Sequence, residues 1–165
     1  MKKILDNSFL YFLISPFPLA FLIPILITRI GYNVDFSFHG TIRLLGIIPI
    51  VLGFVPLINS FFKFKNDGDR SPHPFNVAPK LVVTGFYSYV RNPMYVGVLL
   101  IILGLVIIFL NYLILIYGFI LWVFVNTFII KYEEPKLTEA FGEGFKEYCK
   151  NVHRWIPRIK PWKNR

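Results

Sequence analysis

The sequence predicts an all-α, polytopic membrane protein with about four transmembrane helices and a C-terminal amphipathic helix at the membrane interface. The 165-residue chain is 55% hydrophobic and 18% aromatic, and its mean hydropathy of +0.58 exceeds that of a soluble domain of this size. Long stretches carry no charged residue, and Lys and Arg residues flank those stretches. Because four spans use most of the chain, residues 1–165 are expected to form a single integral membrane domain.

The four spans are expected at about residues 8–28, 44–62, 94–110 and 112–130. Uncharged stretches of 22 and 19 residues, at 7–28 and 44–62, supply the first two. The last two share a run of 39 residues between Arg91 and Lys131 that contains neither a charge nor a histidine. At a rise of about 1.5 Å per residue, this run is about twice as long as one bilayer crossing requires. It therefore predicts a helical hairpin that turns near Asn111 and Tyr112 and returns both of its ends to the same membrane face.

The first apolar stretch could alternatively begin a cleaved signal peptide, because Lys2 and Lys3 precede it. However, the stretch is long, contains Pro16, Pro18 and Pro24, and lacks a small-x-small cleavage site. We favour a retained, kinked span, since packed neighbours can satisfy the carbonyl groups that proline leaves free.

The distribution of positive charge predicts the orientation. Lys and Arg residues cluster at the amino terminus, between the second and third spans, and after residue 130, whereas the turn of the hairpin has no charge. The positive-inside rule then places both termini and the central loop in the cytoplasm. Composition favours a bacterial inner membrane, or the endoplasmic reticulum if the source is eukaryotic. We attribute the net charge of +9 to topology and to contact with anionic membrane lipids rather than to nucleic-acid binding.

Small residues recur at helical spacing in two of the spans. Gly46 and Gly53 are seven residues apart, and so are Gly97 and Gly104. Small residues on one face let a second helix or a ligand approach the backbone closely. Helix packing is the favoured explanation for the first pair.

No metal site is expected. Asp67 and Asp69 lack the later ligands of a calcium-binding loop, and turn formation explains them better. His73 lies between two prolines and is expected to be a solvated loop residue. The lone Cys149 has no Cys or His partner at metal-binding spacing, so a buried structural thiol is expected.

The segment from Glu133 onward changes to the pattern of an amphipathic helix. Pro135 suits its first turn, where a missing N–H costs nothing. The apolar residues that recur at steps of three and four are Leu137, Phe141, Phe145, Tyr148 and Val152. We expect this helix to lie along the cytoplasmic interface, with Arg154 and Trp155 as an anchor behind it.

Two polar clusters flank the predicted hairpin. The first contains Arg91, the phenols Tyr87 and Tyr95, and a helix-breaking proline, and the second contains Glu133 and Glu134. A zwitterionic aromatic cofactor such as S-adenosylmethionine could use all of these groups. Its carboxylate needs a cation, its hydroxyl and amino groups need a carboxylate, and aromatic faces favour its sulfonium. Ordinary charged residues at span ends would explain the same composition and spacing.

The order of the motifs resembles a known family. Residues 80–157 contain Gly85-x-Tyr87-x-x-x-Arg91-Asn92-Pro93-x-Tyr95-x-Gly97, the hairpin, and then Glu133-Glu134-x-x-Leu137-x-x-x-Phe141-Gly142-x-x-Phe145-x-x-Tyr148. This pattern resembles the isoprenylcysteine carboxyl methyltransferase family and the related phospholipid methyltransferase-like integral membrane methyltransferases. Spans one and two resemble that family only in being apolar.

The resemblance implies an S-adenosylmethionine-dependent methyltransferase that acts on a lipidic or prenylated acceptor. The implied cofactor-binding residues are Leu81, Val82, Tyr87, Asn92, Pro93, Met94, Tyr95, Gly97 and Glu133, and the implied catalytic residues are Arg91, Glu133 and Glu134. The chain departs from the family pattern at Asn92, where a His is usual, and at Ile129, where the carboxyl methyltransferases place a substrate-binding Arg. The identity of the acceptor, its reacting atom and the oligomeric state stay open.

Two other functions stay open. Membrane sterol reductases, which use NADPH, resemble the same half of the chain through an Arg-x-Pro-x-Tyr element and a Tyr-Cys-containing tail, although they generally carry more spans. A non-catalytic membrane subunit would use the charged clusters only for packing.

Overall fold

The computed structural model describes residues 17–29, 40–67 and 80–163, and within these ranges all regular structure is helical. The elements in chain order are the π-helix η1 (Pro18–Leu22), α2 (Ile23–Arg29), α3 (Gly40–Leu44), α4 (Ile47–Asp67), the 3₁₀-helix η2 (Gly85–Ser88), α5 (Pro93–Phe109), α6 (Tyr112–Phe128), the π-helix η3 (Ile129–Glu133) and α7 (Glu134–Asn151). The predicted all-α class is therefore confirmed for the described residues.

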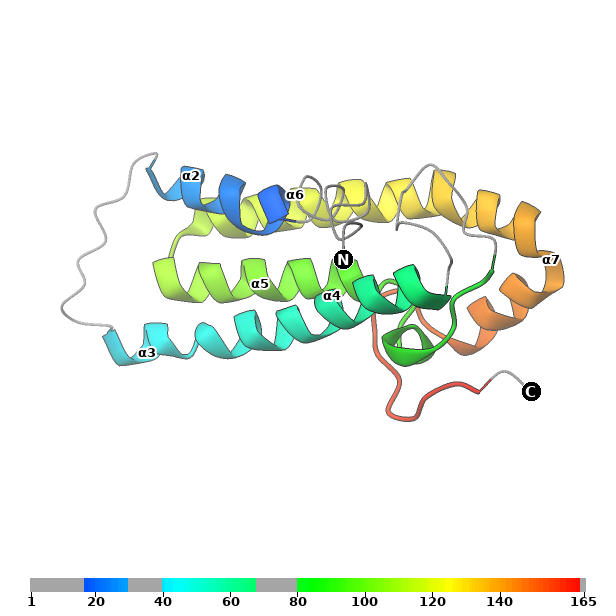
Figure 1. Ribbon diagram of the computed structural model, residues 1–165. Helices are drawn as coiled ribbons and strands as arrows, with labels where there is room; N and C mark the ends of the chain where they lie inside the picture. Colours follow the sequence, from blue (N-terminus) through cyan, green and yellow to red (C-terminus); the bar gives the residue numbers. More distant parts are fainter. Residues whose placement is uncertain (1–16, 30–39, 68–79, 164–165) are drawn as a thin grey trace, which may run out of the picture.

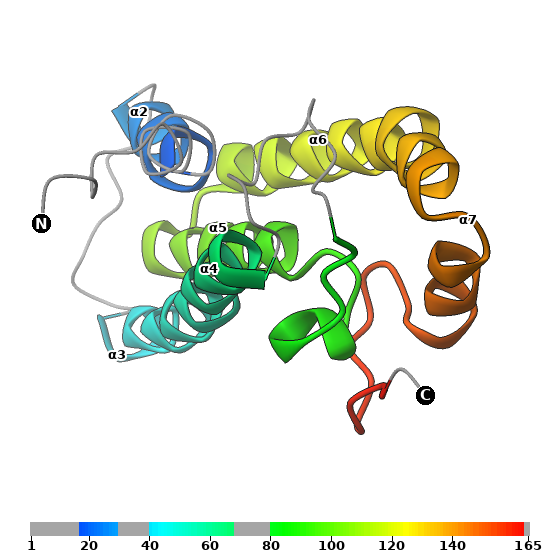
Figure 2. The ribbon, with the colours of Figure 1, turned by 45° about the vertical axis from the view of Figure 1, so that its right-hand side comes forward.

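The long helices lie side by side and alternate in direction. Figure 1 shows α4, α5 and α6 running along the length of the molecule, with α2 beside α6. Figures 1 and 2 place α3 and the α5–α6 turn at one end, and η2 and α7 together at the other end. The topology therefore gathers both predicted polar clusters at a single end of the bundle.

Two helical stretches of the described part are long and apolar enough to cross a membrane, Gly40–Ser60 and Tyr112–Asn151. The apolar helices Pro18–Arg29 and Pro93–Phe109 are shorter. The exposed large apolar residues include Ile48, Val51, Leu52, Val55 and Ile58 on α4 and Leu115, Ile116, Phe119, Ile120 and Phe124 on α6. Continuous apolar faces of this kind suit lipid rather than water. Residues 8–16 of the first expected span lie outside the described ranges.

The expected span at 44–62 differs from the structure at its start. Helix α3 precedes it, and a tight turn at Leu45 and Gly46 separates α3 from α4. The reason lies in Pro49, which has no N–H to donate to the carbonyl of Leu45. That carbonyl instead accepts from the N–H of Ile48 at 3.2 Å, one residue earlier than in an α-helix.

The predicted turn between two helices is confirmed, whereas the return of both ends to one membrane face stays a prediction. Helix α5 ends where Leu110 adopts the left-handed conformation, with φ 48°. The next residue, Asn111, caps α6, because its side-chain oxygen accepts from the N–H of Leu113 at 2.8 Å. Asn111 is buried, so the cap also gives its side-chain oxygen a hydrogen-bond partner inside the protein.

Glycines bring α4 and α5 into backbone contact. A methyl group at Gly46 would lie 2.5 Å from the carbonyl oxygen of Gly104, and one at Gly53 would lie 2.5 Å from that of Gly97. These distances are shorter than real methyl contacts, so neither helix has room for a side chain at the crossing. The helix-packing interpretation of Gly46 and Gly53 is confirmed, and Gly97 and Gly104 are their partners at the crossing.

A methyl group at this crossing should destabilise the protein. We expect Gly97→Ala to lower the thermal midpoint in detergent, because overpacking of a close contact typically costs about 1–3 kcal/mol. Gly144→Ala on α7 is the matched control, since nothing lies within 4 Å of its added methyl group. It should keep or raise the midpoint, because alanine favours a helix more than glycine does. Equal midpoints for the two variants would contradict the packing argument.

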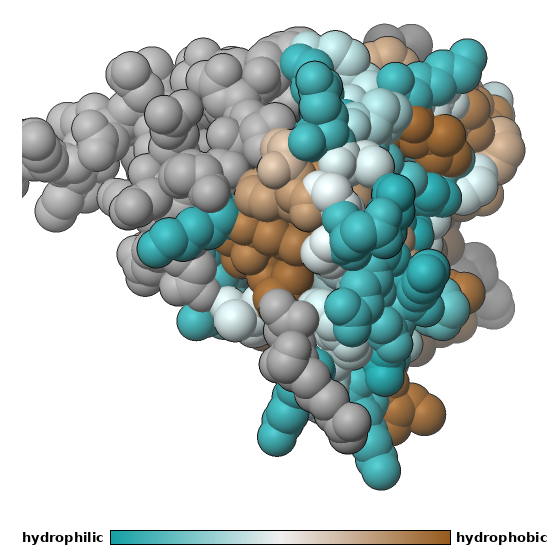
Figure 3. All heavy atoms as spheres, turned by 90° about the vertical axis from the view of Figure 1, so that its right-hand side faces the viewer, coloured by the Kyte–Doolittle hydropathy of each residue, from teal (hydrophilic) through white to brown (hydrophobic). Residues whose placement is uncertain are grey.

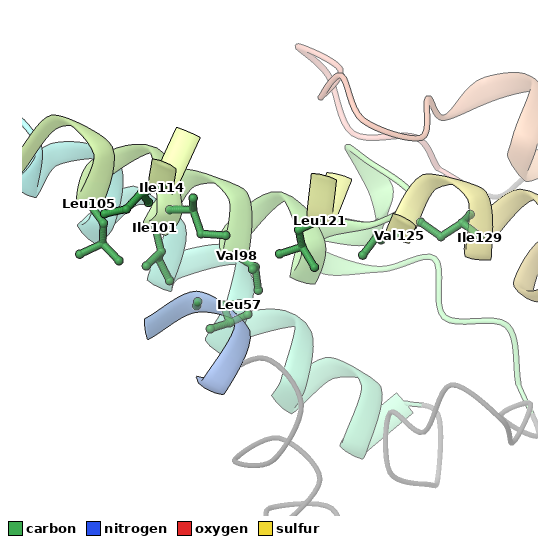
Figure 4. Close-up of a cluster of buried hydrophobic side chains, with 10 residues drawn as sticks. Leu57, Val98, Ile101, Leu105, Ile114, Leu121, Val125 and Ile129 are labelled. Atoms are coloured by element: carbon green, nitrogen blue, oxygen red, sulfur yellow. The ribbon is translucent and has the colours of Figure 1, made fainter. Parts of the chain in front are cut away.

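The core lies between the long helices. Figure 4 shows Leu57 of α4, Val98 and Ile101 of α5, and Ile114 and Leu121 of α6 within one buried cluster. The remaining fully buried members of that cluster are Ala20, Ile102, Leu105, Val125 and Ile129. The Tyr117 hydroxyl of α6 donates to the carbonyl of Leu19 at 2.9 Å, which ties η1 to the bundle.

The amphipathic helix predicted after Glu133 is present as α7, with Pro135 in its first turn. It bends at Gly142, where φ is 52° and ψ is −128°. Its apolar residues Phe145, Tyr148 and Val152 pack against the segment 81–83 and Trp162. The apolar face of α7 is thus covered by neighbouring segments of the chain, and its position at a membrane interface stays a prediction.

Candidate active site

Local backbone constraints shape the segment that carries the first polar cluster. Gly85 has φ +62°, and a methyl group there would lie 2.9 Å from Oδ1 of Asn59 on α4, so only glycine fits. Pro93 is buried at the start of α5, where a missing N–H costs nothing. The N–H of Arg91 donates to the carbonyl of His153 at 2.9 Å, which fixes this segment to the chain beyond α7.

A π-helical turn sets the second cluster. Helix α6 does not continue directly into α7 but passes through η3, which ends at Glu133. Such turns hold one more residue than an α-helical turn and are frequent at functional sites. At the end of η3, Glu133 and Glu134 follow one another but reach different partners.

Glu134 is held by two arginines. Its Oε1 lies 2.7 Å from Nη1 of Arg91, and Arg154 contacts both oxygens, with Nε at 2.9 Å from Oε1 and Nη2 at 2.8 Å from Oε2. These side chains are only 14–25% exposed, so water screens the pairs weakly. We call Arg91, Glu134 and Arg154 the arginine clamp. It joins the start of α7 to the segment before α5 and to the tail.

Cys149 differs in its surroundings from the sequence prediction. It is half-buried rather than buried, and its Sγ lies 3.0 Å from Nη1 of Arg91 instead of among apolar groups only. Burial raises the pKa of the Cys149 thiol more than Arg91 lowers it. The thiol is therefore neutral at neutral pH and is a poor nucleophile.

Glu133 has a different environment from Glu134. Its Oε2 is buried and has no hydrogen-bond partner among the described residues. Burial, and then the negative charge of Glu134, raise the pKa of Glu133 to about 7. Tyr87 and Tyr95 lie within electrostatic range of Glu133, and burial followed by that charge raises the pKa of Tyr87. The structure thus places a half-buried carboxyl group, with one buried oxygen, within electrostatic range of two half-buried phenols.

The other predicted site residues are distributed around this environment. Leu81 packs against α7 and Val82 is buried, whereas Met94 and Tyr95 pack against the bundle core. Nδ2 of Asn92 donates to the carbonyl of Arg154 at 3.4 Å. Gly97 lies at the crossing with α4, so that side of it is not open to a ligand.

Several residues around the site were not predicted from the sequence. Arg154 was interpreted only as a membrane anchor, and its pairing with Glu134 was missed. The Tyr148 hydroxyl donates to the carbonyl of Tyr87 at 2.7 Å. The tail adds two backbone bonds, from Arg158 to Tyr89 and from Trp162 to Ser88, each of 2.9 Å. A cation and aromatic residues after an amphipathic helix were the available signal, but their partners lie far away in the sequence.

Comparison with known proteins gives the family. The family model of the phospholipid methyltransferases matches residues 41–144, from α3 into α7. The chain belongs to the phospholipid methyltransferase family. The membership agrees with the motif resemblance and does not favour a sterol-reductase-like function.

One relative matches about half of the chain. The chain is 38% identical over 80 residues to a protein-S-isoprenylcysteine O-methyltransferase of Schizosaccharomyces pombe. The match covers 48% of this chain and 34% of that protein. The chain therefore corresponds to about a third of that relative's length.

Within the described ranges, no group of three or more His, Cys, Asp or Glu side chains could hold a metal ion.

Proposed function

We propose that the protein is a membrane methyltransferase that uses S-adenosylmethionine and methylates a lipidic or lipidated acceptor. The observation that carries the proposal is the buried, unpartnered Oε2 of Glu133 beside Tyr87 and Tyr95. A buried carboxyl oxygen without a partner is costly unless a ligand completes it. Membership in the phospholipid methyltransferase family supports methyl transfer as the reaction.

The residues present fit the cofactor. Glu133 can accept hydrogen bonds from ribose hydroxyl groups or an amino group. Tyr87 and Tyr95 offer aromatic groups for a sulfonium. Arg91 has its Nε buried without a hydrogen-bond partner, so the guanidinium keeps a donor for a carboxylate beside its pair with Glu134.

The bound cofactor supplies a methyl group that its sulfonium has already activated. The protein then has to orient the acceptor and exclude water. A carboxylate or thiolate acceptor needs no base, whereas an ammonium acceptor must first lose a proton. We assign Glu133 to cofactor binding. We assign the arginine clamp to holding the segment before α5, the start of α7 and the tail together around the cofactor.

We further propose that the apolar helices form four spans with both termini in the cytoplasm of a bacterial cell, the membrane being the inner membrane. Figure 3 views the molecule from the end that carries α7, where hydrophilic side chains lie beside an apolar area. A surface of this composition lets a polar cofactor approach from water while the acceptor enters from the bilayer between helices.

Cofactor binding should depend on pH through Glu133. Its pKa of about 7 means that half of the ligand-free protein carries this carboxyl group protonated near neutrality. Because the carboxylate is the better acceptor, affinity for S-adenosylmethionine should rise as the pH increases from 6 to about 8 and then level off. Glu133→Gln should remove this dependence. Isothermal titration at several pH values measures it, and an affinity that is flat in the wild type would contradict it.

The same pKa fixes the sign of the effect on folding. The folded, ligand-free protein holds this proton more tightly than the unfolded chain, whose ordinary value is 4.5. The contribution of Glu133 to the free energy of unfolding therefore falls as the pH rises from 4.5 to about 7.

Equilibrium titration of the purified protein in detergent tests the function. We expect binding of S-adenosylmethionine, with competition by S-adenosylhomocysteine, and no binding of NADPH. Binding of NADPH alone would indicate the reductase, and binding of neither would indicate a non-catalytic subunit. Incubation with labelled S-adenosylmethionine and a lipid extract, followed by identification of the labelled product, would then give the acceptor.

A further inference from the structure

Two polar side chains interrupt the apolar sequence of α4. Between Ile47 and Phe62 every side chain is apolar except those of Asn59 and Ser60. Ser60 is fully buried, and both its Oγ and Oδ1 of Asn59 are buried without a hydrogen-bond partner. A helical serine can bond back to the carbonyl four residues earlier, but Ser60 does not. Helix formation and packing therefore leave both groups unsatisfied.

The register of the α4–α5 contact directs Ser60 toward the start of α5. Gly46 faces Gly104 and Gly53 faces Gly97, so seven residues forward on α4 correspond to seven residues back on α5. Since α5 begins at Pro93, the next step takes Ser60 past the start of α5, toward the segment that contains the buried Val90.

Asn59 contacts the other end of the same segment. Its Oδ1 lies 2.9 Å from the position that a methyl group of Gly85 would take, at the start of η2. Since η2 carries Tyr87, Asn59 lies against the backbone segment that carries one of the candidate site residues.

The same part of α4 is exposed to the bilayer on its outer side. Val55, Ile58 and Phe62 are exposed, and Asn59 is only half-buried. A hydrocarbon chain lying on this face would bring a polar head group to Asn59 and Ser60. A carbonyl oxygen without a donor needs a ligand that donates, such as an amine or a hydroxyl group, and a carboxylate or a quaternary ammonium cannot donate.

We propose that Asn59 and Ser60 bind the hydrogen-bond-donating head group of the lipidic acceptor and so help to select it. The inference rests on the proposed function, because it assigns the acceptor side of the same site. The proposal does not need the substrate-binding Arg that the carboxyl methyltransferases place at position 129. In this chain that position is Ile129, which is buried in the bundle core.

Short-chain lipids that differ only in the head group test the proposal. Diheptanoyl phosphatidylethanolamine and phosphatidylglycerol carry N–H and O–H donors, whereas diheptanoyl phosphatidylcholine carries neither. We expect the wild type in maltoside detergent to bind at least one of the first two about 5–10-fold more tightly than the third, the effect of one hydrogen bond. The lipid that shows the preference distinguishes an amine from a hydroxyl.

Variants locate the preference on α4. Asn59→Leu and Ser60→Ala should each reduce it several-fold, and Ser60→Ala should also unfold at an equal or higher temperature, because it removes an unsatisfied buried group. Thr28→Val on α2 is the matched control, since it removes an exposed helical hydroxyl far along the bundle from this site. It should keep the preference.

Two results would overturn the inference: a wild type that binds all three lipids equally, or a preference that survives in both Asn59→Leu and Ser60→Ala. Titration of the same preparations with S-adenosylmethionine should give equal affinities for the wild type and the variants. Failure of the wild type to bind S-adenosylmethionine would refute the proposed function and would not change the outcome of the lipid comparison.

Discussion

Replacing Glu133 with alanine should weaken the binding of S-adenosylmethionine about 10- to 100-fold. Its buried Oε2 has no partner within the described part of the protein, so the ligand is expected to complete it. Hydrogen bonds to a charged group contribute about 1.5–3 kcal/mol, and each 1.4 kcal/mol corresponds to about a tenfold change in affinity. Equilibrium titration in detergent measures the loss.

Two further variants separate binding from folding. Glu133→Gln keeps the shape but loses the charge, so its affinity should fall less than that of the alanine variant. At pH 8 the ligand-free Gln variant should unfold at a higher temperature than the wild type, because it does not desolvate a charge. Glu139→Gln, at an exposed position on α7, is the control and should change neither property. Unchanged affinity in Glu133→Ala would remove Glu133 from the cofactor site.

Replacing Glu134 with glutamine should cause a large loss of stability. Glu134 is the carboxylate of the arginine clamp, and its loss of charge leaves Arg91 and Arg154 close together without a counter-ion. Removing one partner of a buried ion pair typically costs about 3–5 kcal/mol, and the partial exposure of this one places it near the lower end. The thermal midpoint in detergent measures the effect.

The exposed pair between Glu143 and Lys146 on the same helix provides the matched control. Its N–O distance of 2.6 Å is as short as those in the clamp, but its side chains are 52% and 82% exposed. Glu143→Gln should leave the midpoint unchanged, because water screens such a pair. A double variant, Glu134→Gln with Arg154→Met, should recover part of the loss, since the neutral pair leaves fewer buried charges. Equal midpoints for Glu134→Gln and Glu143→Gln would show that the clamp does not hold the fold.

The hairpin shows why part of the fold could be predicted. A run of 39 residues without a charge or a histidine can only be buried or lie in lipid, and its length requires a turn near its middle. Asn111 marks that turn because its side chain caps the second helix. These are local properties, so the sequence alone was sufficient.

The partners of the two glutamates could not be predicted in the same way. The sequence placed Glu133 and Glu134 near Arg91 but assigned all three to one group of site residues. In the structure, Glu134 forms ion pairs with Arg91 and with Arg154, and Arg154 lies 20 residues further along the chain. Lys131, three residues before Glu134, is exposed, and Lys136, two residues after it, donates to the hydroxyl of Tyr132. Which cation reaches a carboxylate depends on where α7 bends and where the tail returns.

By itself the sequence determined the helical class, the position of the hairpin, the close-packing glycines and the gathering of an arginine, tyrosines and glutamates at one end. These follow from hydrophobicity, chain length and local backbone preferences, which act between neighbours in the chain. Only the tertiary structure decided that one glutamate is clamped while the other has an unsatisfied oxygen, and that Asn59 of α4 lies against Gly85 at the start of η2. The physical reason is that burial and hydrogen-bond satisfaction depend on which distant segments meet, and here a π-helical turn and a glycine-lined helix crossing decide those meetings.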